Sequence, residues 1–199
     1  MRANENIKIV SGRVVLVPYR EEHVAKYHEW MASAELQELT ASEPLTLEEE
    51  YAMQKKWQVD DDKLTFIICS AGDAGALTMV GDVNLFLKGP RGDPEFEVEV
   101  EIMIAEPACR RRGLASTALQ LVLSYATYPH SPSPLPVPRD RLVARIGEKN
   151  EPSIRLFEKL GFAVTKRVAV FEEVEMRYQT DSDVSWKAGE VQPCDPRVE

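Results

Sequence analysis

The chain has 199 residues, 44% of them hydrophobic, and a formal net charge of −9 at pH 7. This is enough for one globular domain with a substantial core, and the negative charge argues against nucleic acid or an anionic membrane as a partner. No apolar run could span a bilayer and no signal peptide opens the chain, so we expect a cytoplasmic protein. The three cysteines are widely spaced, and we expect neither disulfides nor a metal.

The amino-terminal half predicts strands and helices. Thr46 and Glu49 have the spacing of a capping box, which indicates where one helix begins, and Asp60 follows its last apolar residues. Hydrophobic periodicity indicates the other elements. The expected elements are a strand at 14–17, a helix at 21–31, a helix between 46 and 60, and strands at 64–69 and 78–87. We expect the segment 31–45 to be irregular.

Between 95 and 126 a strand passes directly into a helix. Hydrophobic and acidic residues alternate from 95 to 104, as in a strand with one buried face. Pro107 ends this strand because it has no N–H group for the ladder. From Leu114 the apolar residues recur every three or four positions, which predicts an amphipathic helix.

The junction between this strand and this helix has the features of an anion site. The first turn of a helix has N–H groups without intrahelical partners, and the helix dipole adds positive potential there. Gly113 and Ala115 leave room near the backbone, and the arginines at 110–112 supply charge and hydrogen-bond donors. We favour a bound phosphate over a merely solvated basic helix start.

The carboxyl-terminal half begins with five prolines between 129 and 138, for which we expect an extended, solvated loop. Asn150 suits the cap of a helix that Gly161 ends. The other expected elements are strands at 142–146, 162–170 and 171–178. The polar segment that follows predicts a loose tail. The expected organisation is therefore one α/β (α+β) domain at 1–179 and a flexible tail at 180–199.

Two motifs resemble signatures of the GNAT superfamily of N-acetyltransferases. Residues 110–115 resemble its acetyl-coenzyme A pyrophosphate loop, Gln/Arg-x-x-Gly-x-Gly/Ala. Residues 150–162 resemble its second signature, Asn-x-x-Ser-x-x-x-Tyr/Phe-x-Lys-x-Gly-Phe. The expected order of strands and helices is also that of this family. The resemblance implies a single mixed, mostly antiparallel, twisted sheet with helices on both faces, splayed at its central strand.

The resemblance also implies acetyl-coenzyme A as co-substrate and a set of residues that bind it. Backbone groups on the splayed central strand would pair with the pantetheine arm, and the loop and the second signature would hold the rest. The implied residues are Met103, Ile104 and Ala105 on the strand, Arg110, Arg111, Arg112, Gly113, Leu114, Ala115 and Ser116 in the loop, and Asn150 and Ser153 in the second signature. Capping of a helix is an alternative and compatible role for Asn150 and Ser153.

Within the superfamily, the segments 40–48, 80–87 and 101–107 are similar to the alpha/beta-tubulin N-acetyltransferase group. This similarity implies a protein substrate with a free N terminus, with tubulin as the candidate. Thr117 replaces a frequent glutamate, and Phe157 replaces a tyrosine that serves as general acid in many members. These departures raise an alternative, a non-catalytic acetyl-coenzyme A-binding scaffold on microtubules. A further alternative is a GNAT enzyme that acts on a small amine or polyamine.

The resemblance implies direct attack of the amine on the thioester, which requires a base. The acidic face of the strand at 95–104 is where we expect to find it, and Glu101 is nearest the splay. We therefore predict Glu101 as the base, acting directly or through water, with Glu43 and Asp82 as reserve candidates. A paired carboxylate with a structural role is the alternative for Glu101.

Overall fold

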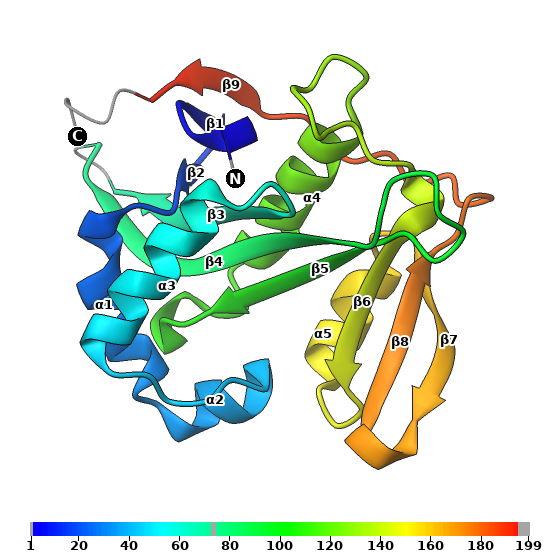
Figure 1. Ribbon diagram of the computed structural model, residues 1–199, viewed down its shortest axis with the longest axis horizontal. Helices are drawn as coiled ribbons and strands as arrows, with labels where there is room; N and C mark the ends of the chain where they lie inside the picture. The colour runs from blue at the N-terminus through cyan, green and yellow to red at the C-terminus, as the bar shows by residue number, and fades with distance from the viewer. Residues whose placement is uncertain (1, 73–74, 195–199) are drawn as a thin grey trace.

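The computed structural model describes residues 2–72 and 75–194, and one sheet of nine strands runs through them (Figure 1). Its order is β7-β8-β6-β5-β4-β3-β2-β1-β9. The strands are β1 (Ile7–Ser11), β2 (Val14–Pro18), β3 (Lys63–Ala71), β4 (Leu77–Lys88), β5 (Glu97–Ile104), β6 (Leu142–Gly147), β7 (Phe162–Val168), β8 (Glu173–Tyr178) and β9 (Glu190–Pro193). All neighbouring strands are antiparallel except β5 and β6, so the mixed, mostly antiparallel sheet is confirmed.

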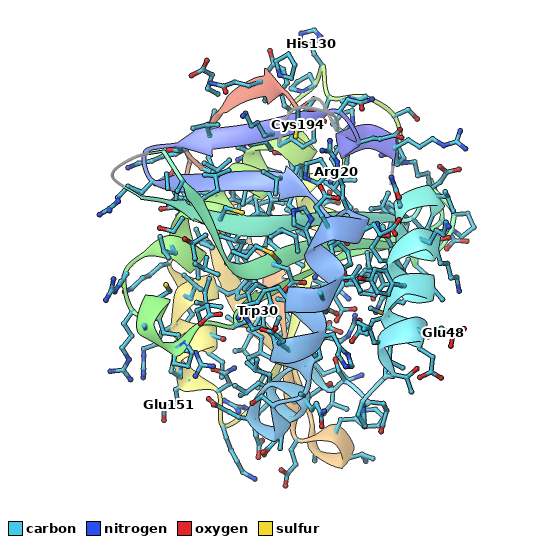
Figure 2. All side chains as sticks on the ribbon, turned by 90° about the vertical axis from the view of Figure 1, so that its left-hand side faces the viewer. Arg20, Trp30, Glu48, His130, Glu151 and Cys194 are labelled. Atoms are coloured by element: carbon cyan, nitrogen blue, oxygen red, sulfur yellow. The ribbon has the colours of Figure 1, made fainter. Side chains whose placement is uncertain are left out.

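Helices cover both faces of this sheet, as predicted (Figure 1). They are α1 (Val24–Met31), α2 (Ala34–Thr40), α3 (Leu47–Val59), α4 (Leu114–Thr127) and α5 (Glu151–Glu158). Two separate hydrophobic clusters lie on the two faces. One packs α4 and α5 against the sheet, and the other packs α1 and α2 against β2, β3 and the end of β5. We call these the α4–α5 face and the α1–α3 face, because α3 lies beside α1 (Figure 2).

The local signals in the sequence account for several of these elements. Thr46 Oγ1 accepts a hydrogen bond from the Glu49 N–H, and Glu49 accepts one from the Thr46 N–H, so the capping box at the start of α3 is confirmed. Alternation along β5 is also confirmed, because Val98 and Val100 are buried in the α4–α5 cluster. By contrast, α2 forms in a segment that we expected to be irregular, and only its Leu36 is buried.

The sheet is splayed between its two central strands. The parallel pairing of β5 with β6 consists of Val98 with Leu142 and Glu99 with Val143, after which the strands diverge (Figure 1). Beyond that point β5 remains paired with β4 alone, up to Ile104 opposite Gly81. Gly81 is required there, since a Cβ atom at this position would lie 1.9 Å from the Met103 carbonyl oxygen. The predicted splay at the central strand is therefore confirmed.

Residues 180–194, part of the segment for which we expected a flexible tail, pack against the domain. Strand β9 pairs with β1 at the edge of the sheet, and Trp186 is buried against Tyr178 with its Nε1 donating to the Leu160 carbonyl. The polar composition suggested solvation, but one tryptophan and one short edge strand are enough to anchor the segment. Residues 195–199 lie outside the described residues.

The segment 129–138 is a loop without helix or strand, as predicted, but it is not solvated along its whole length. Leu135 and Val137 are buried in the α4–α5 cluster, and the Val137 N–H donates to the Ala126 carbonyl over 2.8 Å. Arg91 Nη2 also donates to the Pro136 carbonyl over 2.8 Å. The prolines exclude helix, as expected, but the apolar residues between them pack against α4.

Candidate functional site

Glu101 lies on β5 just beyond the point where β5 and β6 separate. It is an exposed residue on the α1–α3 face and stands directly opposite Asn84 of β4. The predicted candidate is therefore at the opening of the splay, where a ligand that entered between the strands would meet it. No ion pair involves Glu101 within residues 2–72 and 75–194.

The electrostatic surroundings of Glu101 favour its protonated form. Although part of the side chain reaches solvent, the surrounding protein limits its hydration, and this desolvation is the largest cause of a pKa raised to about 7. The Glu99 and Asp82 carboxylates raise the pKa further, while Lys88 and Lys63 lower it. A carboxylate whose pKa lies near neutrality is suited to accept a proton at physiological pH.

The neighbouring acidic residues of β5 are occupied by ion pairs. Arg145 of β6 binds Glu97 at 2.7 Å and Glu99 at 2.8 Å, and Lys88 also pairs with Glu99. A second arginine, Arg177 of β8, binds Glu97 at 2.9 Å. These contacts hold β5, β6 and β8 together at the base of the splay. Glu97 and Glu99 therefore have structural partners, which leaves Glu101 as the available carboxylate on this face of β5.

The two reserve candidates for the base lie in different surroundings. Asp82 is only 2% exposed and accepts hydrogen bonds from the Tyr27 hydroxyl at 3.3 Å and from Asn84 Nδ2 at 2.7 Å. Burial raises its pKa to about 6 although both hydrogen bonds oppose the shift. Glu43 is exposed in the connection between α2 and α3, outside the sheet. Neither combines access to solvent with a place at the splay, and Glu101 does.

The predicted anion loop forms the start of α4. Gly113 is the residue before the helix and has a φ of +79°, and the first intrahelical hydrogen bond runs from the Thr117 N–H to its carbonyl over 3.0 Å. The N–H groups of Leu114, Ala115 and Ser116 therefore precede the first intrahelical bond. No atom lies within 4 Å of a Cβ built on Gly113, so the space beside this turn is open.

The three arginines of this loop differ in their contacts. Arg111 and Arg112 are exposed, and Arg111 has a positive φ of 60°. Arg110 is bound within the protein: its Nε donates to the Ile104 carbonyl at 3.1 Å, and its Nη1 pairs with Glu35 of α2 at 2.7 Å. Arg110 thus joins the loop, the end of β5 and α2 at one place.

The end of β5, where Met103, Ile104 and Ala105 were predicted to bind the cofactor, adjoins this loop. The Ala105 N–H donates to the Val80 carbonyl at 2.9 Å, and the Ile104 carbonyl accepts from Arg110. These two backbone groups already have partners within the protein. Met103 and Ala105 are buried under α1 and α2, so their side chains are not accessible to a ligand.

The second signature lies across the splay, at the start of α5. Asn150 Oδ1 accepts a hydrogen bond from the Ser153 N–H at 3.2 Å, so these two residues form a helix cap. Phe157 does not reach the splay: it is 2% exposed and packs edge-on against Phe162, with the ring centroids 5.2 Å apart. The position that carries a tyrosine in many members is thus part of the α4–α5 cluster here.

Several residues around the site were missed by the sequence analysis. Trp30 of α1 (Figure 2) donates from Nε1 to Glu106 at 2.8 Å, and Glu35 binds Arg110. No sequence signal connects residues this far apart. Asn84 could have been found, because its position two residues after Asp82 on a predicted strand places both side chains on one face.

In the part of the chain that the structure describes, no group of three or more His, Cys, Asp or Glu residues is placed to hold a metal ion. None of its helices combines the length and the apolar character needed to cross a membrane.

Comparison with known proteins gives consistent matches. Residues 13–163 match the family described as "Acetyltransferase (GNAT) domain". The chain is 47% identical over 197 residues to the alpha/beta-tubulin-N-acetyltransferase 9 of Homo sapiens. The aligned region covers 94% of this chain and 90% of that protein.

Two solved structures share the fold. The spermidine N-acetyltransferase of Vibrio cholerae, in complex with CoA and spermine, has a TM-score of 0.68 at 16% identity and covers 83% of this chain and 94% of that one. The ribosomal L7/L12 α-N-protein acetyltransferase RimL also has a TM-score of 0.68 at 16% identity, with 86% and 92% covered. At this level of identity the two matches bear on the fold alone.

Proposed function

The chain belongs to the GNAT acetyltransferase family, and on that premise we propose that it transfers the acetyl group of acetyl-coenzyme A to the α-amine of a protein N terminus. The observation that carries this proposal is Glu101: a carboxylate without an ion pair in the described residues, accessible at the splay, with a pKa raised to about 7. This combination of place and pKa supports Glu101 as the group that would accept one proton from the amine.

The proposed acetyl-coenzyme A site follows the splay. The open space at Gly113 and the N–H groups at the start of α4 fit a pyrophosphate, with Arg111 and Arg112 as exposed cations beside it. Arg110 would hold this loop to β5, and the backbone at 103–105 would hold the pantetheine arm. Asn150 and Ser153 cap α5 on the opposite side and would border the same ligand.

In the proposed reaction the acceptor amine attacks the carbonyl carbon of the thioester. The N–C bond forms, the C–S bond breaks, one amine proton passes to the Glu101 carboxylate, and the thiolate takes a proton from solvent. A thiol has a pKa of about 8.5, so the thiolate leaves with little help from an acid. A tyrosine at position 157 is therefore not needed, which agrees with the burial of Phe157.

Proton energetics favour an α-amine over a lysine as the acceptor. A free α-amino group has a pKa of about 7.8 and a lysine of about 10.4. At pH 7, formation of the neutral amine costs about 1.1 kcal/mol for the first and about 4.6 kcal/mol for the second, at about 1.36 kcal/mol per pKa unit. A site with a single carboxylate is suited to the easier deprotonation. The name of the human relative makes tubulin the candidate acceptor and, with it, the cytoplasm the expected location.

The test uses acetyl-coenzyme A and two peptides of matched sequence, followed by mass spectrometry. One peptide has a free N terminus and no lysine, and the other has a blocked N terminus and one internal lysine. We expect acetylation of the first peptide, including one with a tubulin N-terminal sequence. Preferred acetylation of the blocked peptide would overturn the α-amine assignment. Binding of acetyl-coenzyme A without acetylation of any peptide would favour the scaffold alternative, and acetylation of polyamines alone would favour the small-amine alternative.

A further inference from the structure

A buried hydrogen-bonded group lies next to Glu101 on the α1–α3 face. Tyr27 of α1 and Asn84 of β4 both donate to the same oxygen, Oδ2 of Asp82, over 3.3 and 2.7 Å. Asp82 is 2% exposed, Asn84 5% and Tyr27 7%. Two elements that are distant in the sequence thus meet on one carboxylate.

This group is costly for the fold. A buried carboxylate loses its hydration, and two neutral donors replace only part of it. No cation is paired with Asp82 in the described part of the chain. The opposite face of the same strand is apolar, with Val83 and Leu85 fully buried. A buried polar group that costs the fold this much free energy indicates a role in a functional site.

The register of the sheet connects this group to Glu101. Asn84 stands directly opposite Glu101 in the β4–β5 pair, and Asp82 is its neighbour on the same face. The bond from Nδ2 to Asp82 also fixes the orientation of the Asn84 amide, because the flipped amide would turn its oxygen toward the carboxylate. The Asn84 Oδ1 atom is buried and has no protein partner among the described residues. It is therefore a buried acceptor without a protein partner in the described part of the chain, on the residue that stands opposite Glu101.

We propose that Asp82 is a positioning residue for acyl transfer: supported by Tyr27, it fixes the Asn84 amide so that Oδ1 accepts the carboxyl O–H that Glu101 gains. This inference rests on the proposed function, because it takes Glu101 as the base. The proton passes from the amine nitrogen to a Glu101 carboxylate oxygen, and the resulting O–H donates to Asn84. Asp82 itself neither gains nor loses a proton in this step.

The negative charge of Asp82 also favours the protonated form of Glu101. The Asp82 carboxylate raises the pKa of Glu101, together with desolvation and Glu99, and the Lys88 and Lys63 ammonium groups oppose it. Asp82 has a pKa of about 6, so it is ionised at the pH where Glu101 titrates. The pKa of Tyr27 is raised well above its ordinary value by burial, which keeps its hydroxyl a donor. The other groups that face this cluster are Tyr19, His28 of α1 and Glu50 of α3.

The test compares the unaltered protein with Asp82→Asn, with the Glu101 carboxyl carbon followed by ¹³C NMR as the pH is varied. We expect the pH at the midpoint of the Glu101 titration to fall by about half a unit or more in the variant. The reason is that a neighbouring like charge and the fixed orientation of the Asn84 amide are both lost. Turnover above pH 8 should fall about tenfold while the Kd for acetyl-coenzyme A is unchanged. The matched control is Glu50→Gln, a buried carboxylate on the same face that does not contribute to the Glu101 pKa.

An unchanged midpoint in a folded Asp82→Asn variant would overturn the inference, even if turnover fell, because a merely structural role lowers activity without moving the titration. Where Asp82→Asn does not fold, Tyr27→Phe serves instead. It removes one donor that lowers the Asp82 pKa, so it should move the Glu101 midpoint in the same direction by less. The titration needs no turnover. A protein that bound acetyl-coenzyme A and acetylated nothing would therefore count against the proposed function, while the titration still decided the coupling of Asp82 to Glu101.

Discussion

The two faces of the sheet bury different kinds of side chain. The α4–α5 face buries apolar groups such as Phe66, Leu119 and Phe157. The α1–α3 face buries hydrophobic residues too, but among them lie polar and charged groups, namely Glu50, Gln54, Thr65, Asp82, Asn84 and Glu99. Strand β5 shows the contrast within one element, with Val98 and Val100 toward one face and Glu99 and Glu101 toward the other.

This difference indicates that the α4–α5 face contributes mainly to stability and the α1–α3 face mainly to the proposed reaction. Burial of apolar surface stabilises the fold at every position where it occurs, whereas burial of a polar group costs free energy unless hydrogen bonds compensate. Three of these groups, Asp82, Asn84 and Glu99, lie on β4 and β5 near the point where β5 leaves β6, at the site of the proposed reaction. The comparison predicts that substitutions on the α4–α5 face reduce stability and that substitutions at the splay reduce binding or turnover.

The largest effect is expected on the α4–α5 face. Phe157→Ala should lower the free energy of unfolding by about 3–5 kcal/mol, because it removes a fully buried ring and leaves a cavity. Urea denaturation measures this change. Phe171→Ala is the matched control, since Phe171 is 71% exposed, and it should cost less than about 0.5 kcal/mol. Equal losses for the two variants would mean that Phe157 does not belong to the core.

The next effect is expected at the start of α4. Gly113→Glu should weaken acetyl-coenzyme A binding by more than about a hundredfold, because a carboxylate would occupy and repel the phosphate position. Isothermal titration calorimetry measures the Kd. The control is Gly12→Glu, because Gly12 also has a positive φ and open space around it, so the backbone strain is matched. Unchanged affinity in a folded Gly113→Glu protein would remove the loop from the cofactor site.

At the splay itself, Glu101→Gln should slow turnover by about a hundredfold and leave the Kd for acetyl-coenzyme A unchanged. The pH dependence of kcat should have a definite direction. In the unaltered protein kcat should fall as the pH drops through about 7, because a protonated Glu101 cannot accept a proton. The part of this fall that Glu101 causes should disappear in the variant, which leaves only the titration of the acceptor amine. Glu95→Gln, an exposed glutamate just before β5, is the control that should keep both the rate and its pH dependence.

The smallest effect is expected at position 157, where the family resemblance suggests a catalytic tyrosine but the side chain is buried in the core. Phe157→Tyr restores the residue type of many relatives, but on the buried side of α5. It should change turnover by less than about tenfold, or about 1.4 kcal/mol, since the leaving thiolate needs little acid catalysis. Steady-state kinetics decide this, and a hundredfold gain would show that position 157 reaches the reacting atoms after all.

The sequence predicted the parts of this protein that obey local rules. Alternation identified β5, the pair Thr46 and Glu49 marked the start of α3, and Asn150 marked the cap of α5. The order of the elements and two motifs were enough for the fold and for the position of the loop that precedes α4. These signals are readable because each depends on residues no more than about four positions apart, within one helix turn or one strand.

Only the tertiary structure decided which distant residues meet. Tyr27 reaches Asp82 across 55 positions of sequence and Arg110 reaches Glu35 across 75, and neither pair leaves a periodic trace. The same holds for β9 on β1 and for the burial of Leu135 and Val137, which composition alone placed in solvent. Such contacts depend on how whole elements pack, so their free energy is shared among many residues and no local pattern records it.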